Sequence, residues 1–153
     1  MTRTPAVLGL DFGGTKIAAA LVADDRILAR EQMETPRTGG GADIVEAIAR
    51  LASRLPTTRR IGVAATGIVR DGALTALNPT TLPIENNFPL AEALASRLGA
   101  SPLVINDAQA AGWGEYRFGA GRDFRAMAFI TVSTGIGGAF VLVTIVALFT
   151  ISG

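Results

Sequence analysis

Two glycine-rich segments of this 153-residue sequence combine the groups that bind phosphate. The first, Asp11-Phe-Gly-Gly-Thr-Lys16, holds a carboxylate, a hydroxyl and the single lysine of the chain, and the second is Thr131-Val-Ser-Thr-Gly-Ile-Gly-Gly138. Glycines let backbone N–H groups approach an anion closely. Because each segment follows an apolar run, the pair indicates a nucleotide whose phosphates are held from both sides. The alternatives are an ordinary hairpin whose glycines supply positive φ angles, and a flexible bend before a buried strand.

A carboxylate and an amide stand together at Asn106-Asp107, directly after the apolar run 102–105. In open α/β sheets, ligands bind outside the carboxyl ends of the strands. Asp107 could therefore act as a general base on a substrate hydroxyl that Asn106 holds. The alternative is a helix N-cap, for which both residue types are favoured. Gly67 follows another apolar run, so its loop either opens at the same edge of the sheet or simply ends a strand.

Two residue types that are absent from the composition exclude several kinds of chemistry. The chain has no histidine and no cysteine. It therefore has no disulfide, no thiol nucleophile, no Ser-His-Asp triad and no zinc site built from Cys and His. A formal net charge of +1 without a basic tract argues against nucleic acid as the main partner. The chemistry that remains is that of carboxylates, hydroxyls, backbone amides and basic side chains.

The hydrophobic pattern predicts an α/β fold with the order βββαβαβα, followed by a strand. Helices between buried strands indicate a mostly parallel sheet, and the opening hairpins indicate an antiparallel edge, so the sheet is mixed. Residues 72–89 are predicted to be irregular, after a turn at 70–72. The predicted strands are residues 6–10, 17–22, 26–33, 60–66, 102–105 and 127–132, and the predicted helices are residues 42–55, 90–98 and 108–118.

The C-terminal part of the sequence is unusually apolar. Residues 126–153 carry no charge, and residues 139–151 are almost wholly apolar. A transmembrane helix needs about 20 apolar residues, and the run reaches that length only if the glycine-rich segment is counted. Its β-branched residues favour a buried strand over a membrane span. At the other end, the apolar run before Asp11 is too short for a signal peptide.

Four segments, residues 10–16, 65–67, 105–107 and 134–138, resemble in order and spacing the sugar-kinase branch of the ROK family (repressor, open reading frame, kinase). That resemblance implies the actin-like ATPase fold, which is ribonuclease H-like. It runs from about residue 7 to residue 138 and corresponds to the first half of a family member. Within the family, the loops at 66–72, 76–79 and 105–111 are most similar to bacterial N-acetylmannosamine kinases.

The resemblance implies ATP-dependent phosphorylation of the 6-hydroxyl of N-acetylmannosamine, a step of sialic acid catabolism, in the cytoplasm. The implied partners are the sugar, ATP and Mg²⁺, with no nucleic acid and no membrane. Alternatives within the family are a glucokinase and an N-acetylglucosamine kinase. Alternatives outside catalysis are a sugar- or nucleotide-binding module and a degenerate fragment.

By the same resemblance, Asp107 is the catalytic base and Asp11 faces Mg²⁺ through phosphates or water. The implied sugar-binding residues are Gly67, Thr80, Asn106 and Asp107. The implied ATP-binding residues are Gly9, Leu10, Asp11, Phe12, Gly13, Gly14, Thr15, Lys16, Val132, Ser133, Thr134, Gly135, Ile136, Gly137, Gly138 and Ala139.

The sequence departs from the family in three respects. The family's second half carries a structural zinc held by His and Cys, and the sequence has neither residue type, so no zinc is expected. Ala139 stands where a further glycine is usual, and residues 140–153 have no recognised counterpart. The resemblance thus implies an N-terminal lobe at 1–122 and the start of a second, mostly absent lobe at 123–153. We expect a truncated chain with weak or no activity, without the family's homodimer.

Overall fold

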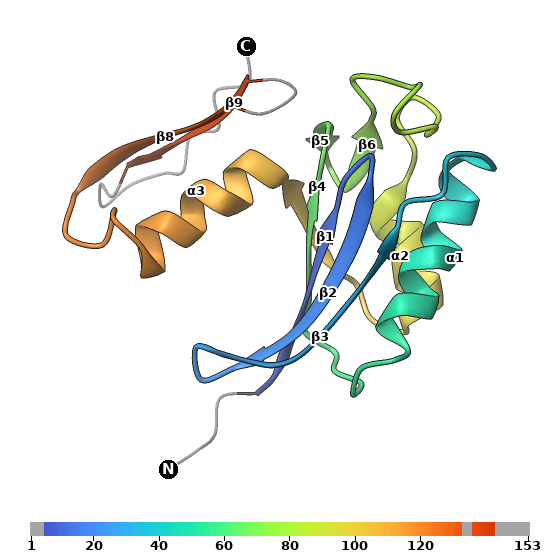
Figure 1. Cartoon of the computed structure of the whole chain (residues 1–153), viewed down its shortest axis with the longest axis horizontal. Helices are drawn as coiled ribbons and strands as arrows, with labels where there is room; N and C mark the ends of the chain where they lie inside the picture. The colour runs from blue at the N-terminus through green and yellow to red at the C-terminus, as the bar shows by residue number, and fades with distance from the viewer. Residues whose placement is uncertain (1–4, 133–135, 143–153) are drawn as a thin grey trace. The chain divides into compact units, whose positions relative to one another are not determined.

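A five-stranded mixed sheet forms the centre of the first part of the chain (Figure 1). The computed structural model describes residues 5–132 and 136–142. The strand order is β3-β2-β1-β4-β7, with β1, β2 and β3 antiparallel and β1, β4 and β7 parallel. The predicted mixed sheet with an antiparallel edge is therefore confirmed. The strands are β1 (Val7–Phe12), β2 (Lys16–Ala23), β3 (Arg26–Glu34), β4 (Ile61–Ala65) and β7 (Leu103–Asn106).

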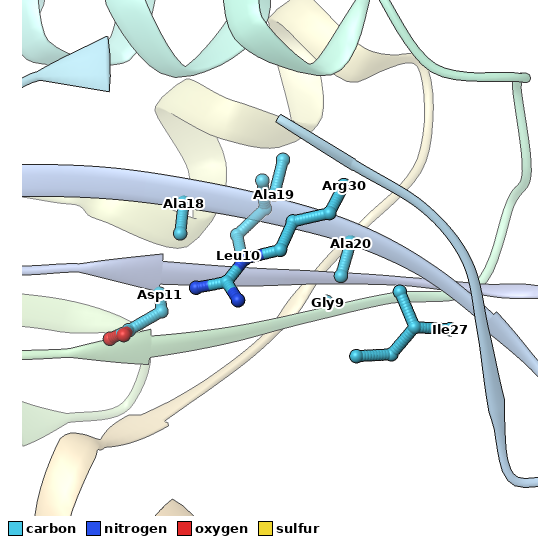
Figure 2. Close-up of a pocket in the computed structure, with 8 residues that line it drawn as sticks. All are labelled: Gly9, Leu10, Asp11, Ala18, Ala19, Ala20, Ile27 and Arg30. Carbon is cyan, nitrogen blue, oxygen red and sulfur yellow. The ribbon is translucent and has the colours of Figure 1, made fainter. Parts of the chain in front are cut away.

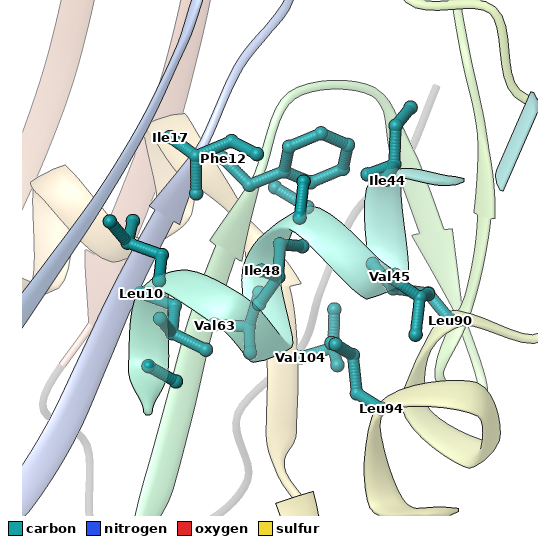
Figure 3. Close-up of a cluster of buried hydrophobic side chains, with 14 of the residues drawn as sticks. Leu10, Phe12, Ile17, Ile44, Val45, Ile48, Val63, Leu90, Leu94 and Val104 are labelled. Carbon is teal, nitrogen blue, oxygen red and sulfur yellow. The ribbon is translucent and has the colours of Figure 1, made fainter. Parts of the chain in front are cut away.

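Two helices, α1 (Gly40–Ala52) and α2 (Leu90–Leu98), cover one face of this sheet (Figure 1). Apolar residues at helical spacing along α1, including Ile44 and Ile48, are fully buried, as are Phe12 and Val63 of the sheet (Figure 3). Each such side chain contributes about 1.5–3 kcal/mol by leaving water. This packing holds the central strands in place beneath the helices.

The opposite face of the sheet carries small side chains and one carboxylate. Because successive side chains of a strand point to opposite faces, Leu10 and Phe12 of β1 enter the core, whereas Gly9 and Asp11 lie on the other face. Asp11 is exposed there, at the end of β1. The strand pattern thus presents the carboxylate on the face away from α1 and α2.

A short hairpin that the sequence analysis missed follows β4. Its strands are β5 (Ile68–Arg70) and β6 (Ala73–Thr75). The predicted turn at 70–72 is confirmed, with positive φ angles at Asp71 (50°) and Gly72 (79°). The prediction of irregular structure is wrong for residues 73–75. Three-residue strands are too short to show an alternating hydrophobic pattern.

Contacts divide the chain into two units, Met1–Asp107 and Ala108–Gly153. The second contains most of α3 (Asp107–Phe118) and the antiparallel hairpin of β8 (Ala126–Val132) and β9 (Ile136–Leu142). The lobe boundary between residues 122 and 123 stays a prediction.

The glycine turn predicted at 133–138 is wrong at its end, because Ile136 pairs with Val132 and Gly138 pairs with Ile130 in the hairpin. In the apolar tail, the predicted burial holds for Val141, which is 7% exposed, but not for Phe140, which is 81% exposed. The rest of the tail, residues 143–153, lies outside the described residues. None of the helices that the structure describes has the length and apolar character of a membrane span.

Candidate active site

The predicted site residues of the first unit gather where three parallel strands end. Phe12 of β1 pairs with Ala65 of β4, and Ala65 pairs with Asn106 of β7. The backbone N–H of Thr66 also donates to the carbonyl of Phe12 at 3.0 Å. The glycine turn after β1, the loop after β4 and the start of α3 therefore meet at one edge of the sheet. Ligands bind at such edges in open α/β sheets.

Asp107, the predicted base, accepts a hydrogen bond from a neighbour that the sequence analysis missed. The hydroxyl of Thr66 donates to Oδ2 of Asp107 at 2.7 Å. Asp107 is half-buried and is the first residue of α3. A hydroxyl bound to a carboxylate at this distance forms a charge-assisted hydrogen bond. The sequence does contain a signal for this contact. Thr66 carries a hydroxyl directly before Gly67, and it follows β4, the strand that pairs with β7 and its last residue Asn106.

Asn106 and Gly67, two predicted sugar-binding residues, contact each other directly. The side-chain amide of Asn106 donates to the carbonyl of Gly67 at 2.9 Å. Gly67 is buried and has a φ of +129°, and a Cβ added there would lie 2.6 Å from the carbonyl oxygen of Thr75. A residue with a side chain does not fit this backbone. Gly67 is thus tightly packed after the end of β4 and bonded to Asn106.

The turn after β1 needs a small residue at Gly14, because another loop approaches it closely, and it needs no positive φ at either glycine. Gly13 closes the turn by donating its N–H to the carbonyl of Lys16 at 3.1 Å. The turn joins β1 and β2 in an antiparallel hairpin, as the alternative predicted, but neither Gly13 nor Gly14 has a positive φ, so that part of the explanation is wrong. A Cβ on Gly14 would instead lie 3.0 Å from the carbonyl oxygen of Thr81. The turn is therefore packed against the loop that contains Thr80 and Thr81.

Thr35, directly after β3, holds this glycine turn through two hydrogen bonds. Its hydroxyl donates to the carbonyl of Gly13 at 2.6 Å, and its backbone N–H donates to the carbonyl of Thr15 at 3.1 Å. The residue is only 4% exposed. No motif in the sequence indicated this role. The buried hydroxyl and the backbone N–H of Thr35 thus each hold one carbonyl of the predicted phosphate-binding turn.

Replacing Thr35 by valine is expected to lower the free energy of unfolding by about 1–3 kcal/mol, because the carbonyl of Gly13 loses its buried donor while the shape is kept. Urea unfolding of the two proteins measures the change. The matched control is Thr38→Val, since Thr38 is exposed, and it is expected to change stability by less than about 0.5 kcal/mol. Equal effects of the two substitutions would contradict this role of Thr35.

Thr80 lies in the loop that packs on the glycine turn. Its N–H and its hydroxyl both donate to the side-chain carbonyl of Asn78. Hydrogen bonds thus join Asn106 to Gly67, and Asp107 to Thr66, the residue before Gly67. Thr80 is connected to the glycine turn through its neighbour Thr81.

A hollow of about 390 Å³ lies beside Asp11 on the sheet face opposite the helices (Figure 2). Gly9 contributes to its wall, and the side chain of Arg30 extends over it from β3. Leu10 and Phe12 direct their side chains into the core, so only their backbone atoms face the site edge. Thr15 and Lys16 are exposed at the turn. Asp11 therefore offers an exposed oxygen ligand of the kind that Mg²⁺ takes.

The second predicted ATP-binding segment belongs to the second unit. Val132 ends β8, and Ile136, Gly137, Gly138 and Ala139 begin β9. Ser133, Thr134 and Gly135 lie outside the described residues.

Comparison with known proteins places the chain in a family. The family model described as "ROK family" matches residues 7–147. The chain is 47% identical over 138 residues to an N-acetylmannosamine kinase from Citrobacter koseri, covering 89% of this chain and 47% of that protein. It is 48% identical over 137 residues to a bifunctional enzyme NanE/NanK from Brucella melitensis, covering 89% of this chain and 26% of that protein. The chain thus spans about half or less of the length of these relatives.

A solved structure shares the fold. It is a ROK family glucokinase from Streptomyces griseus in complex with glucose and AMPPNP, and it matches with a TM-score of 0.76 and 38% sequence identity, over 90% of this chain and 44% of that chain. The predicted actin-like ATPase fold is therefore confirmed. With a family model matching most of its length, the chain belongs to the ROK family.

Proposed function

We propose that the chain provides the sugar-binding and phosphate-binding parts of an ATP-dependent kinase that phosphorylates the 6-hydroxyl of N-acetylmannosamine. The observation that carries this proposal is the pair of hydrogen bonds at one strand edge, Thr66 to Asp107 and Asn106 to Gly67, beside the glycine turn. Such an edge offers a base and an amide to a substrate hydroxyl. The Citrobacter koseri relative supports N-acetylmannosamine as the sugar.

In the proposed reaction, Asn106, Gly67 and Thr80 hold the sugar so that its 6-hydroxyl faces Asp107. The carboxylate accepts the hydroxyl proton as the oxygen attacks the γ-phosphorus of ATP. The bond from that phosphorus to the bridging oxygen breaks, and ADP leaves. Phosphoryl transfer needs mainly positioning and charge neutralisation, so a base and phosphate-binding groups suffice.

The glycine turn and its neighbours are proposed to hold the ATP phosphates. The exposed ammonium of Lys16 supplies positive charge, and the backbone N–H of Gly14 supplies a donor to the phosphate oxygens. Mg²⁺, when bound, neutralises phosphate charge, and Asp11 would hold it.

Residues 132–139 are proposed as the second phosphate-binding segment, and residues 1–122 as the N-terminal lobe. Because ATP is the phosphate donor, we place the reaction in the cytoplasm.

The test compares three sugars as acceptors. The purified chain is incubated with radiolabelled ATP, Mg²⁺ and N-acetylmannosamine, N-acetylglucosamine or glucose, and the sugar phosphates are separated and counted. A parallel series adds the C-terminal half of the Citrobacter koseri relative, since this chain spans 47% of that protein. We expect the highest kcat/KM with N-acetylmannosamine.

A higher kcat/KM with glucose would favour the alternative glucokinase activity, which the Streptomyces griseus structure with bound glucose motivates. A preference for N-acetylglucosamine would favour the alternative N-acetylglucosamine kinase activity. Absence of any sugar phosphate in both series would contradict a kinase role for this chain.

A further inference from the structure

We propose that Thr66 is a positioning residue, which holds the carboxylate of Asp107 in the orientation required of the base. This inference rests on the proposed function, because it concerns the base of that reaction. It starts from the 2.7 Å hydrogen bond from the Thr66 hydroxyl to Oδ2 of Asp107, which joins the end of β4 to the start of α3.

The backbone of Thr66 is fixed on both sides. Ala65 before it is fully buried, and Gly67 after it is buried against Thr75. The N–H of Thr66 itself donates to the carbonyl of Phe12 at 3.0 Å. Because threonine is branched at Cβ, few χ1 rotamers are open to it. The hydroxyl is therefore held at a defined point of the strand edge.

The position of Asp107 at the start of α3 also offers its carboxylate a competing role. An aspartate at the start of a helix is attracted to the N–H groups of the first turn, as a cap or through the helix dipole. A bond to the hydroxyl of Thr66 draws one carboxylate oxygen toward the end of β4, where Asn106 contacts Gly67. A carboxylate has about four lone-pair sites, and the bond from Thr66 occupies one of them.

The same hydroxyl also borders the glycine turn. A Cβ added to Gly13 would lie 3.4 Å from Oγ1 of Thr66. Thr66 thus stands between the predicted phosphate-binding turn and the predicted base, and it contacts Asp107 directly. A valine in its place would keep the shape and remove the donor, whereas a serine would keep the donor.

The first readout is the side-chain rotamer of Asp107, measured in the isotope-labelled chain from its three-bond scalar couplings, without any turnover. We expect a single χ1 rotamer in the wild type and in Thr66→Ser, and averaged couplings in Thr66→Val. The amide spectrum of the remaining residues shows whether each variant is folded. Unchanged Asp107 couplings in folded Thr66→Val would overturn the proposal.

The second readout is the kinetics of phosphoryl transfer in the assay described above. We expect Thr66→Val to lower kcat about 10- to 100-fold, since small misplacements of a catalytic group have effects of this size, while KM for the sugar changes little and Thr66→Ser recovers most of the rate. Added to Asp107→Asn, Thr66→Val should cause no further loss, because the two residues act through one group.

The two hypotheses fail differently in this assay. If Asp107→Asn leaves kcat unchanged, the base assignment of the proposed function is wrong. If Asp107→Asn lowers kcat but Thr66→Val does not, or if their effects multiply, Thr66 has no positioning role.

Discussion

Replacing Asp107 with asparagine is expected to lower kcat for phosphorylation of N-acetylmannosamine by about two to four orders of magnitude. That is the usual contribution of a positioned general base. Asparagine has nearly the same shape and can still accept the hydrogen bond that Thr66 donates at 2.7 Å. It cannot take up a proton, so the substitution removes the chemical role and keeps the packing. The measurement is the rate of sugar phosphate formation at saturating sugar and ATP.

Asp25→Asn is the matched control for this experiment. Asp25 is exposed in the turn between β2 and β3, with a φ of 59°, a conformation that asparagine also adopts readily. This turn lies at the edge of the sheet opposite the candidate site, because β2 begins at the glycine turn and ends at Ala23. We expect the rate of Asp25→Asn to equal that of the wild type. Similar losses in both variants would contradict the assignment of Asp107 as the base.

The largest loss of stability is expected from Gly67→Ala, about 2–6 kcal/mol in the free energy of unfolding. A side chain at a φ of +129° is strained, and its Cβ would lie 2.6 Å from the carbonyl oxygen of Thr75 and 3.0 Å from Leu74. The strain and the overpacking each cost about 1–3 kcal/mol. A domain has about 5–15 kcal/mol in total, so urea unfolding should show a much lower midpoint.

Substitutions at two other glycines allow the backbone strain and the steric clash to be measured separately. Gly99 has a φ of +70° but open space around its Cβ position, so Gly99→Ala measures the backbone strain with no clash. Gly62, in the same strand β4, also has open space and no positive φ, so Gly62→Ala should leave stability unchanged or slightly higher. We expect the order Gly67→Ala, Gly99→Ala, Gly62→Ala from most to least destabilised. An effect at Gly67 no larger than that at Gly99 would show that the clash with Thr75 is relieved without cost.

Long periodic segments were predictable from the sequence because each expresses one hydrophobic pattern. The apolar spacing of α1 and the apolar run of β1 follow directly from the burial of these residues in the core. The helix predicted at 90–98 has those bounds, and Gly99 ends it with a left-handed φ. The predicted strand ends at residues 10, 66 and 105 lie within two residues of the observed ends at Phe12, Ala65 and Asn106, which is why the candidate site could be located.

The contacts within the site were not predictable from local pattern. Thr35 and Thr66 are single hydroxyls whose partners lie 22 and 41 residues away in the sequence. Which carbonyl or carboxylate each one reaches depends on the strand register and on loop packing, and neither leaves a periodic signal. The same holds for Gly14, whose small size is explained only by the close approach of Thr81.

The strand edge also has a consequence for the time order of folding. The two hydrogen bonds at its centre join residues 41 and 39 positions apart, Thr66 to Asp107 and Asn106 to Gly67. Long-range parallel pairing is slow, because the chain loses loop entropy before the contacts form. A nascent chain that has emerged from the ribosome only as far as α2 already contains the glycine turn and Thr66, yet it has no partner for either bond. Assembly of the edge must await the synthesis of β7 and the first residue of α3.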